Sequence, residues 1–475
     1  MSASFSFLGF SALVILAYHA GTSAGWRQFV LLVANIFFLG TFSQGLLSYA
    51  PLGAFLVFGY AGLSLVARNP RRAFIPILLA TLVSFFWFKK YAFVPAIVSV
   101  PFTYLTVGMS YILFRILHLM IDTRAGALRD RIGILPYFNY TCNFLTLLSG
   151  PIQLYPDYVK MQERSAESGL TATVVGVSIE RVIRGFFKVN VVALVLSILH
   201  GRVLDALTAG QPFGQKWLLG VLIIVLYPLF LYCNFSGYID IVIGLGYLFG
   251  FSLPENFNHP FTADNFIEFW NRWHITLSSW LRTYVYNAVL LGGMRRFPSR
   301  KIEGVLAVFA YFVTFFLVGL WHGQNSEFIA FGIFMGLGVS INKTWQILLN
   351  RQLGRKRYTE LASNQTYLAF SRGLTFTYFV VTTILFWSNW RQIANLEMAL
   401  GAGASAVAVA GIFFGSTILL WAWQTARTGI MAMPWKDTLL LQCWRAGCSA
   451  ALLVIILVLS MLMNQRAPDI VYKAF

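Results

Sequence analysis

The sequence predicts an all-α polytopic membrane protein, and its composition carries the prediction. Of the 475 residues, 58% are hydrophobic and only 11% are charged, whereas a soluble globular domain carries about 25% charged residues. The mean hydropathy is +0.70. A helix that crosses a membrane needs about 20 largely apolar residues, and apolar stretches of that kind recur along the whole chain. We therefore expect roughly 11 to 14 transmembrane or re-entrant helices.

The apolar stretches follow one another with short polar segments between them. They cover residues 4–19, 28–48, 50–67, 73–88, 96–121, 134–150, 173–199, 217–234, 237–252, 303–321, 326–348, 369–389, 399–423 and 439–463. The first stretch has no basic segment ahead of it, so we expect a transmembrane helix there and not a cleaved signal peptide. No internal repeat or soluble domain interrupts the series. We predict one integral-membrane domain over residues 1–475.

The charge balance is strongly basic, with 35 Lys and Arg against 17 Asp and Glu and a formal charge of +18. In a soluble protein such a balance suggests nucleic-acid binding, but in a membrane protein Lys and Arg collect in cytoplasmic loops and at the interface. We therefore expect no nucleic-acid partner, and we place residues 68–72 and 350–372 in the cytoplasm. A basic cytoplasmic face attracts anionic membrane lipid, coenzyme A phosphates or an acidic carrier protein.

Residues 253–300 are the exception to the apolar series, because they combine prolines, charged residues and many aromatic side chains. Aromatic and leucine side chains recur at three- and four-residue steps over residues 266–281, which is typical of an amphipathic helix at the membrane interface. Asp264 or Thr262 is expected to cap this helix. The glycine pair at 292–293 is expected to end it. We interpret the segment as an interfacial or re-entrant part of an active site.

Two histidines stand in positions that indicate chemistry within the membrane. His322 interrupts an apolar stretch over residues 305–345, and His274 lies in the aromatic segment described above. Ionisable groups inside hydrocarbon are costly and usually functional, and histidine exchanges a proton near neutral pH. The structural alternatives are a packing histidine at a helix end for His322 and an interfacial histidine in an aromatic belt for His274.

Polar residues also break the apolar stretch near residue 237. Asn234, Ser236 and Asp240 are candidates for a polar network beside the histidines, and helix packing through Ser236 and Gly237 is the alternative. The four cysteines are scattered without a CxxC pair, so neither a zinc site nor a disulfide framework is predicted. We expect no bound metal and no bound cofactor.

Several segments taken together resemble a known family. These segments are GMSYILFRILHLMID at 108–122, LLSGPIQ at 147–153, YCNFSGYIDIVIGLGYLFGF at 232–251, PENFNHPF at 254–261, FIEFWNRWHITLSSWLRTYVYN at 266–287, GLWHG at 319–323, FWSNWRQIANLEMAL at 386–400 and APDIVYKAF at 467–475. Their order and spacing are similar to those of the membrane-bound O-acyltransferase (MBOAT) family. The resembling branch is the bacterial one of the alginate O-acetyltransferase membrane subunit and the teichoic-acid D-alanyltransferase.

The resemblance implies a helical fold around a central tunnel, with His322 as the catalytic histidine. Imidazole suits either a general base for an acceptor hydroxyl or an acyl-imidazole intermediate. His274 matches the second histidine of the family, and it would polarise the acyl carbonyl, orient the acceptor or hold His322. The chain departs from the family pattern at Asn234, where relatives usually carry an acid, whereas Asp240 matches.

The aromatic segment supplies the other expected substrate-binding residues. Trp270, Asn271, Arg272 and Trp273 are expected to shape the tunnel together with Trp321. Arg272 would contact a phosphate or carboxylate, or it would only extend its charge to the interface.

The function implied is transfer of an acyl group, most simply acetyl, from a cytoplasmic thioester to a hydroxyl of an extracytoplasmic polysaccharide in the cell envelope, such as an exopolysaccharide. The donor would be acetyl-CoA or an acyl carrier protein, and a periplasmic or extracellular acetylation protein would be a partner. The expected location is the bacterial inner membrane. The alternatives are D-alanyl transfer to teichoic acid, a transporter or channel, and a scaffold for an extracytoplasmic transferase.

Overall fold

The computed structural model describes residues 5–43, 45–91, 102–128, 130–167, 170–210, 212–431 and 439–463. The APDIVYKAF motif at 467–475 lies outside the described residues. The same holds for residues 96–101 of the expected stretch 96–121.

The described residues are predominantly helical and contain no strand beyond one isolated bridge between Phe257 and Trp273. Within these residues, nine helices are long and apolar enough to cross a membrane, and α1 (Phe5–His19) and α2 (Ala24–Gly40) are shorter apolar helices. A lipid environment offers backbone groups no hydrogen bonds, which favours helices because they satisfy these groups internally. The predicted class, an all-α polytopic membrane protein, is confirmed.

The chain divides into two compact units. The first contains residues 1–190, 234–255 and 449–475, and the second contains residues 191–233 and 256–448. Three elements are shared between them: the π-helix η3 (Lys188–Ala193), α10 (Phe213–Leu248) and α20 (Leu439–Met463). The single domain over residues 1–475 remains a prediction.

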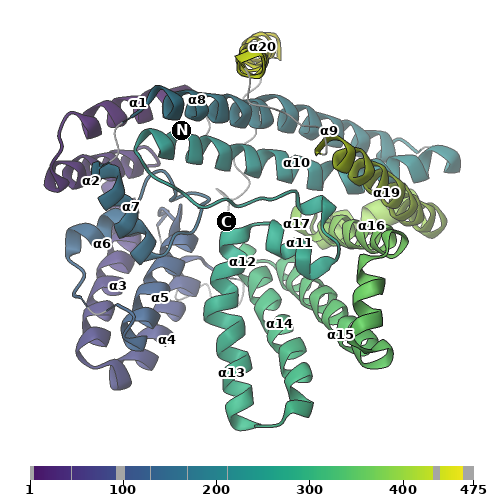
Figure 1. The fold of residues 1–475 in the computed structure, drawn as a ribbon, viewed down its shortest axis with the longest axis horizontal. Coiled ribbons are helices and arrows are strands. Elements are labelled where there is room, and N and C mark those ends of the chain that lie inside the picture. The colour runs from purple at the N-terminus through teal and green to yellow at the C-terminus, as the bar shows by residue number, and fades with distance from the viewer. Residues whose placement is uncertain are drawn as a thin grey trace. The chain divides into compact units, whose positions relative to one another are not determined.

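The first unit contains α1 and α2 and a series of further helices. These are η1 (Leu46–Tyr49), α3 (Ala50–Arg68), α4 (Pro70–Phe88), α5 (Met109–Ala125), α6 (Ile134–Thr141), α7 (Tyr155–Glu167) and α8 (Ala172–Phe187). Helices α3, α4 and α5 lie side by side in Figure 1. Gly59 on α3 allows this approach, because a Cβ there would lie 2.6 Å from Ile116 on α5.

A buried arginine holds the loop after α6 in the first unit. The Arg115 guanidinium donates to the carbonyl oxygens of Tyr140, Thr141 and Thr146 at 2.8–3.1 Å and to the Thr146 hydroxyl at 2.6 Å. His118, one turn further along α5, pairs through Nδ1 with Asp122 at 3.1 Å and accepts at Nε2 from a backbone N–H at 2.9 Å. Bonds of this kind satisfy groups that would be costly to bury alone.

The second unit begins with α9 (Leu194–Thr208) and contains the segments that carry both histidines. Its other elements are η4 (Pro260–Thr262), α11 (Phe266–Arg272), α12 (Ile275–Leu281), the π-helix η5 (Arg282–Tyr286), α13 (Asn287–Arg296), α14 (Arg300–His322), α15 (Ser326–Ser363), α16 (Gln365–Thr382), α17 (Ile384–Trp387), α18 (Trp390–Leu400) and α19 (Ala402–Met431). Helices α13 and α14 form a side-by-side pair in Figure 1, and α14 also packs along α15.

The segment after residue 265 differs from the single amphipathic helix that periodicity predicts. It is interrupted at Trp273 and His274, which separate α11 from α12. The glycine pair at 292–293 lies inside α13, which ends at Arg296, so the expected end of the helix is wrong. Side-chain periodicity reports which face is apolar but carries no signal for a change of backbone direction over the two residues Trp273 and His274.

The expected caps are also wrong. Asn265 is the N-cap of α11, and its side chain accepts a hydrogen bond from the backbone N–H of Glu268 at 3.0 Å. The Asp264 carboxylate instead accepts from the buried Arg372 guanidinium at 2.7 and 3.0 Å. Arg372 is 4% exposed, and an arginine so buried is strongly destabilising unless it is paired. Asp264, which its position in the sequence would make a cap of α11, is therefore occupied by Arg372.

Candidate active site

His322 is the last residue of α14 and is 3% exposed. Its imidazole ring contacts three aromatic rings, with centroid distances of 4.7 Å to Trp321, 4.9 Å to Phe386 and 5.8 Å to Phe331. The ring is therefore enclosed by the ends of α14 and α17 and by the first turns of α15. An enclosed imidazole is protected from bulk water.

Glycines allow the backbone around His322 to close tightly. A Cβ on Gly319 would lie 2.3 Å from Gly332 Cα, and a Cβ on Gly323 would lie 2.0 Å from the Phe328 ring. Contacts that short are not possible, so no side chain fits at either position. Gly319 is thus required by the crossing of α14 and α15 before the histidine, and Gly323 allows the Phe328 ring to lie against the chain just after it.

His274 occupies the break between α11 and α12 and is 1% exposed. Its backbone is left-handed, with φ 46° and ψ 51°, which is uncommon for a residue other than glycine. Such a conformation persists only where the surroundings impose it, and it is frequent at functional sites. His274 therefore lies between two helices and not within a continuous one.

Asn256 imposes this break. Its backbone carbonyl accepts from the Ile275 N–H at 3.0 Å, and its side-chain oxygen accepts from both the N–H and the hydroxyl of Thr276 at 3.1 and 2.6 Å. The N–H of Asn258 in turn donates to the Arg272 carbonyl at 3.0 Å. Residues 256–258 therefore bind both sides of the break. Sequence reasoning did not single out Asn256, and its only signal is a polar residue within the PENFNHPF segment.

Burial keeps His274 neutral. The residue lies outside the nine long apolar helices, and the loss of hydration lowers its pKa to about 3. At neutral pH the imidazole therefore carries one N–H donor and one lone pair. A neutral imidazole can donate a hydrogen bond to a carbonyl oxygen that gains negative charge during a reaction.

The two histidines are linked through Trp321. The indole ring lies 6.2 Å from the His274 ring, in an edge-to-face arrangement, and 4.7 Å from the His322 ring. The fold thus brings together residues 48 positions apart that the sequence singled out separately. Trp321, a predicted substrate-binding residue, is 7% exposed and forms the wall that both imidazoles share.

The four predicted residues of α11 and the break divide into two groups. Trp270 and Trp273 are buried among aromatic rings, with Trp270 4.8 Å from Phe315 and Trp273 5.0 Å from Phe379. Asn271 and Arg272 are half-buried. Both donate to Glu268, each at 2.9 Å.

A polar chain continues from Glu268 to a residue that the predicted site did not include. Asn271 accepts a hydrogen bond from the Arg282 guanidinium across the helix break. Burial would raise the pKa of Glu268, but the hydrogen bonds from Asn271 and Arg272 and the nearby guanidinium charges hold it below its usual value. Glu268 is therefore anionic and already engaged.

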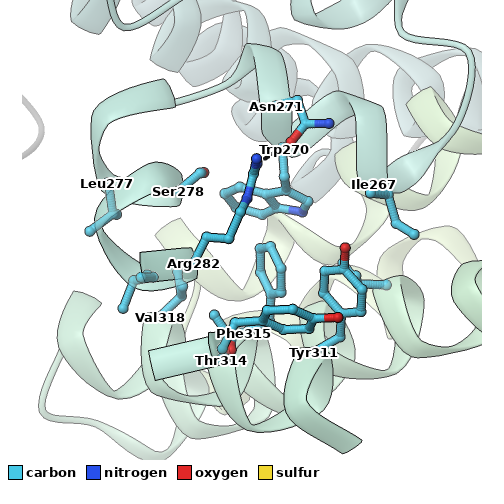
Figure 2. A pocket seen from close by; sticks show the side chains of 13 residues that line it. Ile267, Trp270, Asn271, Leu277, Ser278, Arg282, Tyr311, Thr314, Phe315 and Val318 are labelled. Atoms are coloured by element: carbon cyan, nitrogen blue, oxygen red, sulfur yellow. Dashed lines mark hydrogen bonds between the residues drawn. The ribbon is translucent and has the colours of Figure 1, made fainter. Parts of the chain in front are cut away.

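A small cavity opens beside this polar chain (Figure 2). It is lined by residues of α11, α12, η5, α14 and α15 and has a volume of about 30 Å³, which is more than one water molecule needs and leaves room for a small group. In Figure 2, Asn271 lies above the Trp270 ring and Phe315 and Tyr311 lie below it, and the Arg282 side chain extends toward Asn271. On α14 the lining residues Tyr311, Phe315 and Val318 recur at steps of four and three residues, and His322 follows four residues later. This spacing indicates a shared face only when the segment is known to be a helix.

The remaining predicted residues belong to the first unit. Asn234 and Ser236 are buried. Asp240 accepts from Arg181 Nε at 3.1 Å and from Lys188 Nζ at 2.7 Å. Arg181 also forms two hydrogen bonds with the Glu255 carboxylate, at 2.6 and 2.7 Å.

The same region contains a close helix crossing. A Cβ on Gly237 would lie 2.8 Å from the Gly185 carbonyl oxygen, and a Cβ on Gly185 would lie 2.5 Å from the Gly237 carbonyl oxygen. Close approach through small residues is the usual mode of helix packing in membranes. The packing contact is thus present at Gly237, and Asp240 belongs to an ion-pair network with Arg181 and Lys188. A polar network of Asn234, Ser236 and Asp240 beside the histidines remains a prediction.

The sequence matches a known protein family. The family model of MBOAT, the membrane-bound O-acyltransferase family, matches residues 77–381, a range that contains both histidines and every predicted site residue. The chain belongs to the membrane-bound O-acyltransferase family.

Three relatives illustrate the range of the family. A Teichoic acid D-alanyltransferase of Bacillus subtilis is 29% identical over 229 residues, which are 48% of this chain and 56% of the relative. A Probable alginate O-acetylase AlgI of Pseudomonas putida is 32% identical over 250 residues, 52% and 48% of the two chains. The protein of the same name from Pseudomonas aeruginosa is 33% identical over 241 residues, 50% and 43%. The chain thus matches about half the length of these relatives.

Proposed function

We propose that this protein is an O-acyltransferase that moves an acyl group, most simply acetyl, from a thioester donor onto a hydroxyl of an extracytoplasmic polysaccharide. The donor thioester is acetyl-CoA or an acylated carrier protein, and it reaches the site from the cytoplasm. The protein resides in the bacterial inner membrane and works with a periplasmic or extracellular acetylation protein.

One observation carries the proposal: two buried histidines share the Trp321 ring inside a member of an acyltransferase family. Aromatic rings surround His322, and His274 is held in a left-handed conformation that a packing residue does not need. Acyl transfer to a hydroxyl needs a base for the acceptor and a donor for the developing oxyanion. The pair supplies both functions.

The reaction balances with these two groups. His322 removes the proton of the acceptor hydroxyl, and the oxygen attacks the thioester carbonyl carbon. His274 donates to the carbonyl oxygen while it carries negative charge. The intermediate then collapses, the C–S bond breaks as the C–O ester bond remains, and the departing thiolate takes the proton from His322. The alternative, an acyl group carried on the His322 ring, uses the same residues in two steps.

The charge distribution supports cytoplasmic access for the donor. Lys301, near the start of α14, and Arg351, in the second half of α15, stand at the same end of this helix pair, because Gly304 packs against Ile347. Arg295 and Arg296 at the end of α13 precede this end. Basic residues at helix ends favour the cytoplasmic side, and His322 lies at the opposite end of α14.

The test is the ester content of the surface polysaccharide in cells that carry either wild type or His322→Gln. Base-released acetate and D-alanine are measured side by side, with the amount of inserted protein determined in both strains. His19→Gln is a matched control, because His19 bonds the Leu248 carbonyl in the first unit and glutamine can keep that bond. We expect the acetate ester to disappear in His322→Gln only.

Two other outcomes would redirect the proposal. Loss of D-alanine esters with normal acetate would favour the alternative named by the Bacillus subtilis relative, D-alanyl transfer to teichoic acid. Unchanged esters of both kinds at a normal protein level would remove the transfer function and leave a transporter or a scaffold.

A further inference from the structure

We propose that the cavity in Figure 2 selects the acyl group, and that it admits a short acyl chain without a positive charge. This inference rests on the proposed function, because it assigns a role to the cavity in the same transfer reaction. The names of the relatives leave open whether the transferred group is an uncharged acyl group or an amino-acyl group. The inference assigns the uncharged acyl group to this protein.

The cavity lies on the face of α14 that leads to His322. Tyr311, Phe315 and Val318 line it, and they are spaced by four and three residues, so they share one face of the helix. His322 follows Val318 by four residues, which is one further turn or about 6 Å along the axis. The cavity therefore opens on the same face of α14 as the imidazole, one turn or more away along the helix axis.

The direction of approach also fits the donor. The cavity lies between His322 and the end of α14 that carries Lys301. That end is the one assigned above to the cytoplasm on the basis of its charge. The thioester, which is made in the cytoplasm, would pass this cavity before it meets the histidine.

The walls restrict the size of the acyl group. Trp270 and Phe315 are 4% and 7% exposed, and their rings lie 4.8 Å apart. The space of about 30 Å³ is close to that of one small group. Leu277, Leu281 and Val339 complete the apolar wall. Because well-packed interiors accept extra methylene groups only at a cost, each additional carbon of the acyl chain should be penalised.

The charge of the lining disfavours an ammonium group. Arg282 contributes a guanidinium to the lining, and the described residues that line the cavity include no Asp or Glu. The nearby carboxylate of Glu268 is already bound by Asn271 and Arg272. Arg282 is exposed, but its guanidinium is held by Asn271 at the cavity. A D-alanyl group would bring its ammonium beside this cation without an available anion, which is unfavourable.

The lining also offers a donor for an uncharged carbonyl. The Trp270 indole nitrogen is buried, and it has no hydrogen-bond partner within the part of the chain that the structure describes. Indole is a donor only, so a thioester or ester carbonyl oxygen would satisfy it. An unpaired buried donor is costly and calls for an explanation, and a bound acyl carbonyl supplies one.

The experiment compares three pantetheine thioesters, acetyl, isobutyryl and D-alanyl, with membrane vesicles that contain the full-length chain and its native partner proteins. The readout is the thiol release that is lost in His322→Gln. Isobutyryl and D-alanyl have nearly the same shape, and they differ by a methyl group in place of an ammonium. The ratio of thiol release from the acetyl and isobutyryl thioesters therefore reports the effect of size. The ratio for the isobutyryl and D-alanyl thioesters reports the effect of charge.

We expect wild type to prefer acetyl over isobutyryl by about tenfold or more, and isobutyryl over D-alanyl by a similar factor. Trp270→Ala should reduce the size preference about tenfold, whereas Trp345→Ala, a tryptophan of α15 that is 50% exposed, should leave it unchanged. Arg282→Gln should raise the use of D-alanyl relative to isobutyryl. If Trp270→Ala does not insert, Phe315→Leu opens the same wall.

The inference is overturned if wild type uses D-alanyl as well as isobutyryl, or if neither Trp270→Ala nor Phe315→Leu changes the size preference. Failure of the proposed function is a different result, namely no His322-dependent thiol release from any of the three donors.

Discussion

The Cα atoms of Gly319 and Gly332 face each other where α14 crosses α15, so the two helices touch backbone to backbone. A Cβ on Gly319 would lie 2.3 Å from Gly332 Cα, and a Cβ on Gly332 would lie 3.0 Å from Gly319 Cα. His322 follows this contact by three residues on α14. The position of the imidazole is therefore set by a crossing that admits no side chain.

Gly319→Ala should separate α14 from α15 and displace His322. The added methyl group meets backbone atoms on the other helix, which cannot rotate away, so we expect a loss of several kcal/mol together with loss of acyl transfer. The measurement is thermal unfolding of the protein in detergent, combined with the ester assay. Gly292→Ala is the matched control, because its Cβ meets no atom within 4 Å. That change should be neutral or stabilise α13 by about 0.5–1 kcal/mol. Equal behaviour of the two variants would contradict the crossing.

Asn256→Ala should release the break that presents His274. Two donors of Thr276 lose their acceptor, which should cost about 2 kcal/mol, and transfer should fall about tenfold or more because the imidazole is misplaced. Unfolding and thiol release from an acetyl thioester check both effects. Asn258→Ala is the control, since Asn258 is exposed and the bond described above uses only its backbone. A normal rate in Asn256→Ala would show that His274 needs no such support.

Asp240→Asn should destabilise the ionic network of the first unit. The change removes the carboxylate charge that pairs with Arg181 and Lys188, while Arg181 keeps its ion pair with Glu255. We expect a loss of about 2 kcal/mol, below the roughly 3–5 kcal/mol seen when a fully buried pair is broken. Glu163→Gln on the exposed side of α7 is the control. If Asp240→Asn abolishes transfer while the unfolding temperature stays at the wild-type value, the residue acts in the reaction and not in packing.

The stability of the protein should depend on pH through His274. Its pKa is lowered from about 6.5 to about 3 by burial, so the unfolded chain binds a proton in this window and the folded protein does not. Stability is therefore complete above about pH 6.5 and is lost as the pH falls toward 3. His274→Asn, which tolerates the left-handed backbone, should flatten the unfolding temperature between pH 6.5 and 4 relative to wild type. An unchanged pH slope would mean that His274 is not buried as a neutral group.

The candidate site shows what local sequence context can indicate. His322 and His274 were singled out because ionisable residues in apolar or aromatic surroundings are unusual, and the fold brings both to one indole ring. The assignment of Trp270 to a substrate path came from the family resemblance, and the structure places Trp270 in the wall of a cavity. Local context can indicate such residues because the unusual feature is the residue itself, and their roles in the reaction remain predictions.

The same segment shows where prediction fails. Periodicity over residues 266–281 indicated one helix, but the chain breaks at His274 because Asn256 binds the backbone on one side of the break. Arg282 reaches Asn271 across that break, and Asp264 pairs with Arg372, which is 108 residues away. No local pattern encodes these partners, since each depends on where a distant segment lies.

The sequence by itself determined that this is a helical membrane protein, because hydropathy and the length of apolar stretches are local properties that a bilayer reads directly. It also determined which residues are chemically out of place. Only the tertiary structure decided which polar groups satisfy one another, where the helix breaks, and which walls enclose the cavity beside Trp270. Those outcomes depend on packing and on hydrogen bonds between distant segments, and buried polar groups must find such partners wherever the fold supplies them.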